Sequence, residues 1–146
     1  MVRRNLKGAA FAFILGILFA TSATAVFAAS ASSPYGYYGP YQGYSYKNMA
    51  DIISGSGVWG YADVYNQTSD SVPTGYMGAE GRVFNSAGNL VASSNMKYNS
   101  SAASGLLVPS ETYYSSGTYY SYGITAAYNG NGYNEYYTLK SPSINY

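Results

Sequence analysis

The sequence predicts an all-β protein, a small antiparallel β-sandwich or barrel of about six strands, preceded by a signal peptide and a disordered arm rich in Tyr and Gly. Short runs rich in Tyr, Val, Ile and Thr recur along the chain, and Gly, Asn, Pro and Ser separate them. Several runs alternate between two kinds of side chain, as strands with two different faces do. No convincing helical pattern interrupts them, and such spacing is typical of sandwiches and small barrels.

Residues 1–28 have the three parts of a secretory signal peptide. Basic residues open the segment, an apolar run follows at residues 9–20, and small residues end it. A membrane-anchoring helix is the alternative. It is disfavoured because Thr and Ser at residues 21–24 dilute the apolar run before it reaches the ~20 residues that a membrane span needs.

Cleavage of the signal is expected after Ala28, with Ala25 and Ala31 as the other small-residue sites. The mature chain would keep four basic residues against six acidic ones, a net charge of −2. This charge removes the main driving force for binding nucleic acid or an anionic membrane. We therefore expect no nucleic-acid partner and, after cleavage, no stable membrane span.

The chain contains no Cys. Exported domains of this size often carry disulfides, so their absence favours a bacterial product, from a Gram-positive type of cell. We expect the mature protein to be secreted and extracellular. Without disulfides the fold must rest on its core and its hydrogen bonds, and Tyr rings must supply much of that core.

Residues 29–47 are predicted to be a low-complexity arm of Tyr, Gly, Pro and Ser, disordered or extended because it lacks the aliphatic residues of a core. Its rings would be free to stack on sugars, on cell wall or on one another. A passive spacer is the alternative. The candidate contact residues of the arm are Tyr35, Tyr37, Tyr38, Tyr41, Tyr44 and Tyr46.

Residues 48–146 are predicted to form the single folded domain. Residues 48–53 could make one or two helical turns. Residues 57–65 alternate between a small face and an aromatic face, which indicates a strand. Further strands are expected at residues 76–84, 90–98 and 105–108, separated by turn-forming segments.

Residues 118–140 are predicted to form a β-hairpin, with the Asn-Gly-Asn-Gly sequence of residues 129–132 as its turn. If Gly130 and Asn131 are the two-residue loop, the pairs are Tyr128 with Tyr133, Ala126 with Glu135, Ile124 with Tyr137, and Tyr122 with Leu139.

The two faces of this hairpin differ in polarity. One face carries Ile124 and Leu139, and we expect it to be buried. The other carries Thr125 and Tyr136, and we expect it to face solvent. Sliding the loop by one position moves the register by two residues and leaves the faces unchanged, so this assignment does not depend on the choice of turn.

Catalytic chemistry is limited by composition. The chain has neither His nor Cys, which removes the commonest general base, the thiol nucleophile and most transition-metal sites. Glu80, Glu111 and Glu135 could supply the carboxylate pair of a glycosidase. We expect instead that they lie in surface ion pairs, with Glu80 beside Arg82.

Calcium binding has little support. Asp63, Asn66 and Asp70 could offer oxygen ligands from one loop, yet their spacing matches no EF-hand pattern. We therefore predict no metal site, no cofactor and no catalytic residue.

The sequence predicts a secreted, non-enzymatic extracellular protein with a binding or structural role at the cell surface or matrix, acting through exposed Tyr. Its partners would be cell-wall polysaccharide, an extracellular protein or a second copy of itself. A secreted antimicrobial or toxin-like protein is the alternative, weakened by the negative net charge, and a secreted hydrolase is the least favoured. The candidate contacts beyond the arm are Trp59, Tyr61, Tyr65 and Tyr136.

Overall fold

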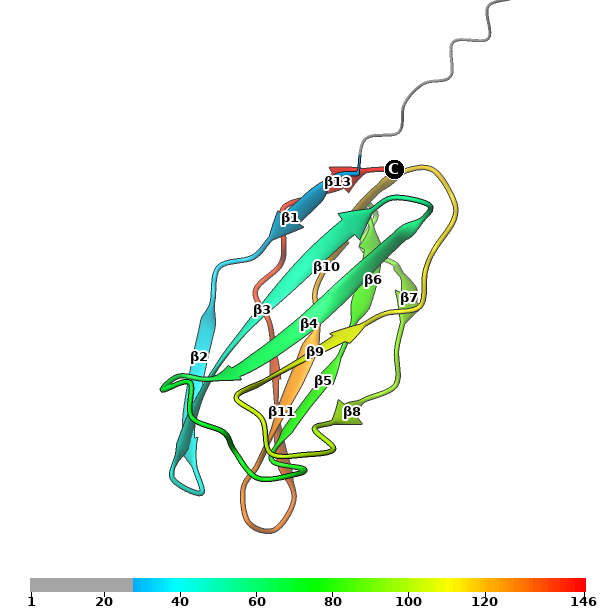
Figure 1. The fold of residues 1–146 in the computed structure, drawn as a ribbon. Helices are drawn as coiled ribbons and strands as arrows, with labels where there is room; N and C mark the ends of the chain where they lie inside the picture. The colour runs from blue at the N-terminus through cyan, green and yellow to red at the C-terminus, as the bar shows by residue number, and fades with distance from the viewer. Residues whose placement is uncertain (1–27) are drawn as a thin grey trace, which may run out of the picture.

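Strict alternation of inward and outward side chains builds the first sheet. The computed structural model describes residues 28–146, so the predicted signal peptide, apart from Ala28, lies outside the described residues. β3 (Tyr44–Ser54) and β4 (Val58–Asn66) pair antiparallel along their length. From Tyr46 to Ser54 every second side chain of β3 is buried. These two strands form the centre of one layer of the molecule (Figure 1).

Three further strands complete this first layer. β1 (Ser30–Ser32) and β2 (Gly36–Tyr41) follow one another along the free edge of β3, and β9 (Gly105–Pro109) pairs with β4. All these pairings are antiparallel. Among residues 28–146 no helix is long and apolar enough to cross a membrane.

Two four-stranded sheets lie end to end and form the second layer. Each strand of one sheet runs, after a short interruption, into the corresponding strand of the other; β5, for example, continues into β6 after Gly81. The first sheet is ordered β12 (Tyr133–Tyr137), β11 (Ile124–Tyr128), β5 (Met77–Glu80), β8 (Lys97–Tyr98), and the second β13 (Ile144–Asn145), β10 (Thr118–Ser121), β6 (Arg82–Asn85), β7 (Leu90–Ser93).

The two layers meet backbone to backbone at a narrow waist, formed by Gly60 of the first layer and Gly81, Ser121 and Gly123 of the second. A Cβ atom added to Gly123 would lie 2.5 Å from the Cβ of Ala62, closer than real Cβ atoms approach. A Cβ atom added to Gly81 would lie 2.6 Å from the carbonyl oxygen of Gly60. Only residues without a side chain fit at these positions.

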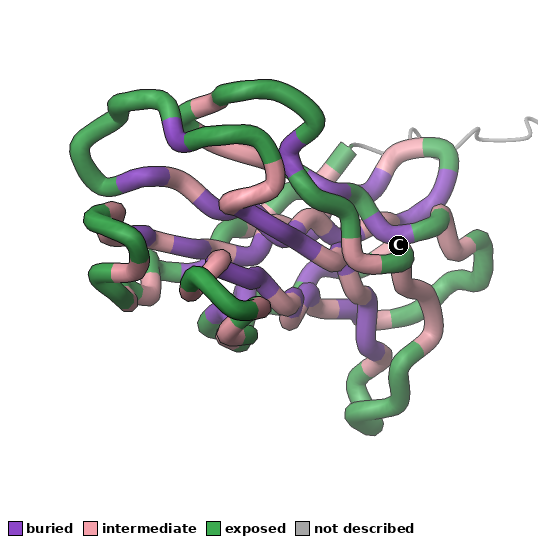
Figure 2. Tube along the Cα trace, turned by 90° about the horizontal axis from the view of Figure 1, so that it is seen from below, coloured by how far each residue is buried: buried purple, intermediate pink, exposed green. Residues whose placement is uncertain are grey.

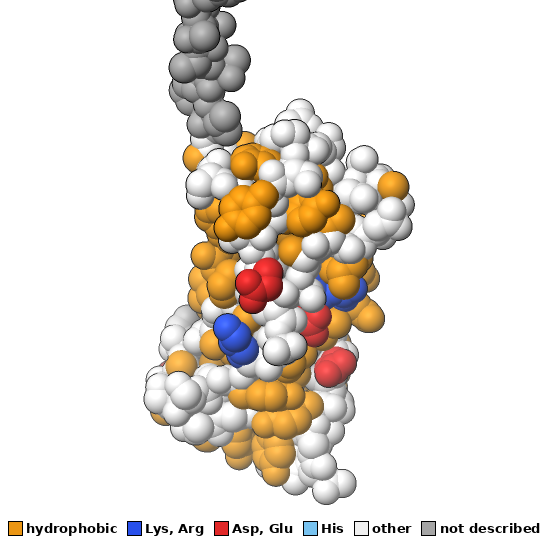
Figure 3. Space-filling model, turned by 90° about the vertical axis from the view of Figure 1, so that its right-hand side faces the viewer, with side chains coloured by type: hydrophobic (Ala, Val, Ile, Leu, Met, Phe, Trp, Pro, Cys, Tyr) orange, Lys and Arg blue, Asp and Glu red, His pale blue; other side chains and the backbone are white. Residues whose placement is uncertain are grey.

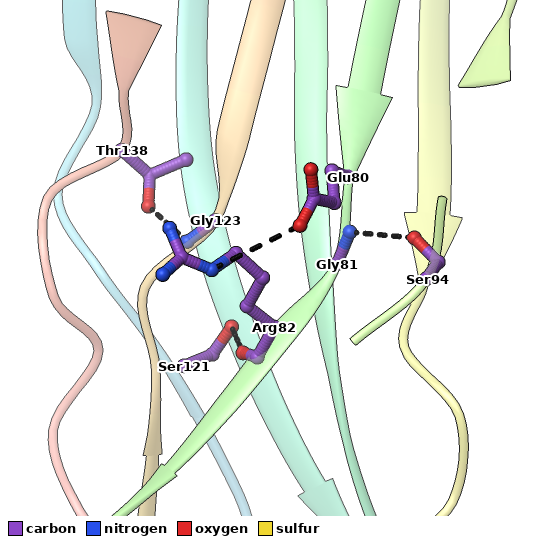
Figure 4. A network of polar contacts seen from close by, with 7 residues as sticks. All are labelled: Glu80, Gly81, Arg82, Ser94, Ser121, Gly123 and Thr138. Atoms are coloured by element: carbon purple, nitrogen blue, oxygen red, sulfur yellow. Dashed lines mark hydrogen bonds and ion pairs between the residues drawn. The ribbon is translucent and has the colours of Figure 1, made fainter. Parts of the chain in front are cut away.

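Hydrogen bonds hold the waist where side-chain packing cannot. The Ser121 hydroxyl lies 3.2 Å from the carbonyl oxygen of Tyr61 and 3.0 Å from that of Arg82, which joins the two layers. The Gly123 amide donates to the hydroxyl of Thr138 at 3.0 Å. Figure 4 shows the Ser121–Arg82 and Gly123–Thr138 contacts beside the Glu80–Arg82 pair. The strand interruptions of the second layer lie at this level.

The waist divides the hydrophobic core into two clusters, one under each sheet of the second layer. Figure 2 shows the buried segments in the middle of the molecule, with exposed loops around them. The first cluster comprises Tyr46, Ala62, Val64, Val72, Met77, Ala79, Val108 and Ala127, and the second Ile52, Val58, Val83, Tyr119 and Ile144.

The predicted all-β class is confirmed, and the described residues contain thirteen strands. The strand predicted at residues 57–65 is β4, and the small side chains of one predicted face point inward. The one predicted at residues 76–84 is split into β5 and β6. The helical turns considered at residues 48–53 do not form, because this segment continues the alternation of β3.

The register predicted for the hairpin is confirmed within residues 124–137. Asn129 and Gly132 are joined by a backbone hydrogen bond of 2.9 Å, which leaves Gly130 and Asn131 as the loop. Gly130 has a φ of 99°, the sign that a tight hairpin loop requires there. The predicted pairing of residue 122 with residue 139 does not form, because the strand is interrupted after β10.

The predicted faces of this hairpin are wrong. Thr125 is 0% exposed, whereas Leu139 is 48% exposed and Ile124 only half-buried. Thr125 lies inside because its hydroxyl accepts a hydrogen bond from the Asn48 amide at 2.8 Å and lies 3.0 Å from the Tyr38 hydroxyl. Near the waist, small polar side chains fit between the layers and large aliphatic ones do not.

The predicted disorder of residues 29–47 is also wrong, and the folded domain does not begin at residue 48. The segment forms β1, β2 and the start of β3. Its hairpin loop is Gln42 and Gly43, both with positive φ, 49° and 84°. The loop tip is joined to the other hairpin, because the Gln42 amide donates to the carbonyl of Asn129 at 3.0 Å.

The six tyrosines of this segment divide into two groups. Tyr38 is stacked between Tyr46 and Tyr136, with ring centroids 5.6 and 4.1 Å away. Burial raises the pKa of the Tyr38 hydroxyl well above its usual value. The inward group is Tyr46, which is buried in the core, with Tyr38, Tyr41 and Tyr44, which are partly buried against it. The outward group is Tyr35 and Tyr37.

The waist predicts that Gly123→Ala destabilises the fold. The added methyl group would press on Ala62, and overpacking of this kind costs ~1–3 kcal/mol or more. Gly55→Ala is the matched control, because its Cβ would find Trp59 at 3.5 Å, an ordinary contact; we expect a change within about 0.5 kcal/mol. Chemical denaturation measures both, and equal effects would contradict the waist.

The division of the tyrosines predicts unequal effects of substitution. Tyr38→Ser should lower the free energy of unfolding by ~2–5 kcal/mol, because it empties a packed site between the layers. Tyr37, which is 66% exposed, should tolerate Ser with a change within about 0.5 kcal/mol. Thermal melting of both variants checks this, and an unchanged melting temperature for Tyr38→Ser would mean that residues 36–41 do not pack on the domain.

Candidate functional site

The outward side chains of the first sheet form one continuous surface, which we call the outer aromatic face. Alternation along β4 directs Trp59, Tyr61, Asp63 and Tyr65 away from the waist and the core. The strand register then sets their neighbours on β2, β3 and β9. The outer aromatic face consists of Tyr35, Tyr37, Lys47, Met49, Asp51, Trp59, Tyr61, Asp63, Tyr65 and Leu107.

Register arranges this face in rows that cross the strands. Tyr65 lies opposite Lys47, which lies opposite Tyr37 of β2. Asp63 has Met49 on one side and Leu107 on the other. The next two rows pair Tyr61 with Asp51 and Trp59 with Ile53. Cross-strand neighbours on one face are about 5 Å apart, so aromatic rings surround the two carboxylates.

One corner of the face holds a cation between two rings. The Lys47 ammonium lies 4.8 Å from the ring centroid of Tyr35 and 6.0 Å from that of Tyr65. The two rings meet edge to face at 6.4 Å. Cation–π attraction therefore fixes the Lys47 side chain and orders Tyr35, which directly precedes β2.

The centre of the face holds a carboxylate pair. Asp63 is 1% exposed, and Asp51 and Asp63 each have an Oδ1 atom that is buried without a hydrogen-bond partner among the described residues. Burial, together with the nearby Asp51 carboxylate, raises the pKa of the Asp63 carboxyl to about 7, although the Tyr65 hydroxyl, 3.3 Å from Oδ2, acts to lower it. The pair therefore holds a proton up to near-neutral pH.

The outward face of the second layer differs, because its rings cover one another. Tyr122 and Tyr137 are stacked at 5.1 Å, and Phe84 and Tyr120 at 5.5 Å. Lys140 lies 5.2 Å from the Tyr120 ring centroid and 5.6 Å from that of Tyr122. Stacking covers one side of each of these rings, although Tyr137 remains 60% exposed.

The structure separates the predicted contact residues into two sets. Trp59, Tyr61, Tyr65, Tyr35 and Tyr37 are brought together on the outer aromatic face. The remaining five lie against the interior and do not join them; the Tyr136 ring packs on Tyr38, and its hydroxyl is hydrogen-bonded to that of Tyr41. The five inward residues are Tyr38, Tyr41, Tyr44, Tyr46 and Tyr136.

Sequence reasoning missed Lys47, Asp51 and Leu107 as parts of this face. Alternation from residue 44 to residue 54 could have placed the first two, had the segment been assigned to one strand. The proximity of Asp51 to Asp63 depends on the pairing register between β3 and β4, which no local pattern gives.

The carboxylates considered for hydrolysis and for calcium binding lie apart. Glu80 forms the expected pair with Arg82, at 4.0 Å. Glu111 lines a groove of about 350 Å³ beside β7. Asn66 points to the opposite face of β4 from Asp63, and its amide donates to the backbone carbonyl of Asp70 at 3.0 Å. Figure 3 views the molecule from the right-hand side of Figure 1. It shows that the few charged side chains on this side lie between hydrophobic areas.

Comparison of the chain with known protein families, with curated proteins and with solved structures found no match. The function must therefore be argued from the geometry of the molecule.

The raised pKa of Asp63 predicts a pH-dependent stability. Its pKa is about 7 in the folded chain against an ordinary 3.8, so the folded state binds more protons between these values. Stability is then greatest below pH 4 and falls as the pH rises towards 7, by at most about 1.4 kcal/mol per pH unit from this group.

Asp63→Asn should remove this slope and raise the melting temperature at pH 8, because a neutral amide avoids burying a charge beside Asp51. Asp70→Asn, in an exposed loop, should keep the wild-type slope. Denaturation at several pH values measures both, and a wild-type slope in Asp63→Asn would contradict the shared proton.

Proposed function

We propose that this chain is a secreted, non-enzymatic binding protein that uses the outer aromatic face to lie on an extracellular polymer, with cell-wall polysaccharide as its target. The observation that carries the proposal is that five aromatic side chains share one face of the molecule, where Tyr35 and Tyr37 are exposed and the other three are half-buried. Trp and Tyr offer large contact area at low entropic cost, together with a polar group.

The rigidity of the sheet supports a flat target. Residues that alternate along β4 are about 6.7 Å apart, so Trp59, Tyr61 and Tyr65 form a row along one strand. Pairing with β3 on one side and β9 on the other fixes this row. A pre-formed surface loses little conformational freedom on binding, which favours affinity.

The charge of the face supports a neutral target. Lys47 lies between two rings, and the proton shared by Asp51 and Asp63 lowers the negative charge at the centre. Neutral sugar rings have apolar C–H faces that stack on aromatic rings. The same neutrality, with the net charge of −2, argues against attack on anionic membranes.

Export is part of the proposal. The pairing of β1 supports cleavage after Ala25 or Ala28 rather than after Ala31. The Ser54 amide donates to the carbonyl of Ala29 at 2.8 Å, and the Ala29 amide donates to the Ser54 hydroxyl at 3.1 Å. A cut after Ala31 would remove these contacts from the domain.

The test is retention on purified bacterial cell wall and on insoluble polysaccharides. A variant with Tyr61→Ser and Tyr65→Ser should lose about tenfold or more in retention, because each aromatic contact contributes ~0.5–1.5 kcal/mol. Tyr137→Ser is the matched control, since Tyr137 is 60% exposed but belongs to β12 on the second layer.

Two results would contradict the proposal. One is equal retention of the double variant and the control. The other is growth inhibition of neighbouring cells without retention on any wall, which would favour the antimicrobial alternative.

A further inference from the structure

A second concave site lies at the end of the sandwich where the loop before β5 meets the β11–β12 hairpin. It has a volume of about 300 Å³ and is lined by Thr74, Gly75, Tyr76, Tyr128 and Tyr133. We call it the tyrosine pocket. It shares no residue with the outer aromatic face. In Figure 1 the two segments meet at the lower end of the molecule.

Three aromatic rings form the walls of the tyrosine pocket. The ring centroids of Tyr76 and Tyr128 are 5.1 Å apart, with 45° between the ring planes. Those of Tyr128 and Tyr133 are 5.7 Å apart, with the rings edge to face. These inclined rings enclose a space instead of stacking on one another.

Contacts from behind hold the walls in place. Tyr98 packs on Tyr133 with centroids 4.4 Å apart, and Tyr44 packs edge to face on Tyr76. The Tyr133 hydroxyl donates to the carbonyl of Gly75 at 2.8 Å, and the Tyr128 hydroxyl donates to a carbonyl of the hairpin loop at 3.0 Å. The pocket is therefore formed before any ligand arrives.

The chemistry of the lining selects the ligand. None of the five residues is charged and none is aliphatic, so neither an ion nor a purely apolar group finds a complement there. Because both bonded hydroxyls donate their protons to the main chain, their free lone pairs are acceptors. The ligand must offer an apolar face for the rings and hydroxyl donors for these acceptors, and it must be small, since the volume is at the lower end for ligand pockets.

We propose that the tyrosine pocket binds one pyranose ring of a neutral saccharide. Its C–H face would lie against Tyr128 or Tyr76, and its hydroxyls would donate to the Tyr133 oxygen. This inference does not depend on the outer aromatic face, which would contact an extended polymer, whereas the pocket takes a single sugar unit.

The experiment is a titration of the ¹⁵N-labelled domain with neutral methyl glycosides of glucose, galactose and N-acetylglucosamine, followed by amide chemical shifts. We expect saturable shifts at the amides of Gly75, Tyr128 and Tyr133 with a Kd in the millimolar range. Because the wild-type protein reports the site directly, this measurement does not depend on the folding of any variant.

Variants then identify the contacts. Tyr133→Ala should weaken binding of the best glycoside about tenfold or more through loss of a stacked ring and its hydroxyl. Tyr133→Phe should bind more tightly than Tyr133→Ala because it keeps the ring. Tyr61→Ser, which alters only the outer aromatic face, should bind the glycoside as the wild type does.

Three outcomes would overturn the inference. These are the absence of saturable shifts with every glycoside, shifts that map to the outer aromatic face and disappear in Tyr61→Ser, and tighter binding of p-cresol than of any glycoside. The last would assign the pocket to an aromatic side chain of a partner. None of these results bears on retention by the Tyr61 and Tyr65 double variant, so the two proposals fail separately.

Discussion

The close approach of the two layers at the glycine waist is the constraint on which the rest of the structure depends. Stacked sheets usually lie about 10 Å apart, with side chains filling the space between them. Here Gly60, Gly81 and Gly123 bring main chain against main chain, and the Ser121 hydroxyl joins the layers by hydrogen bonds. No apolar side chain larger than that of Ala62 fits at this level, so the core forms on either side of it.

The waist explains where polar and aromatic residues lie inside the molecule. Next to the waist, Thr125, Asn48 and Thr138 are buried and hydrogen-bonded, because small polar groups fit the narrow space. Farther along, where the layers separate, Tyr rings fill the gap; Tyr38 and Tyr46 stack between the first sheet and the hairpin of β11 and β12. Tyr provides enough volume here for a chain with few large aliphatic residues.

The same packing determines which aromatic residues remain for binding. Side chains alternate along each strand, so the residue next to an inward-facing one points outward. Tyr37 is exposed because Tyr38 is packed within, and Tyr65 faces outward because Val64 belongs to the core. The outer aromatic face and the tyrosine pocket are therefore consequences of one fold that is built from Tyr, at two separate places on its surface.

The sequence by itself determined the all-β class, the β11–β12 register and the two faces of β4, since these depend on alternation and turn chemistry within short segments. Only the tertiary structure decided the rest. Three features depend on which strands pair and on how closely the layers approach. Thr125 is buried instead of Ile124, the segment around Tyr38 is ordered, and Asp51 lies beside Asp63. The polarity of a short segment does not predict how closely the two layers approach. A small polar side chain is predicted to be exposed, and it is buried only because main chain from the other layer packs against it.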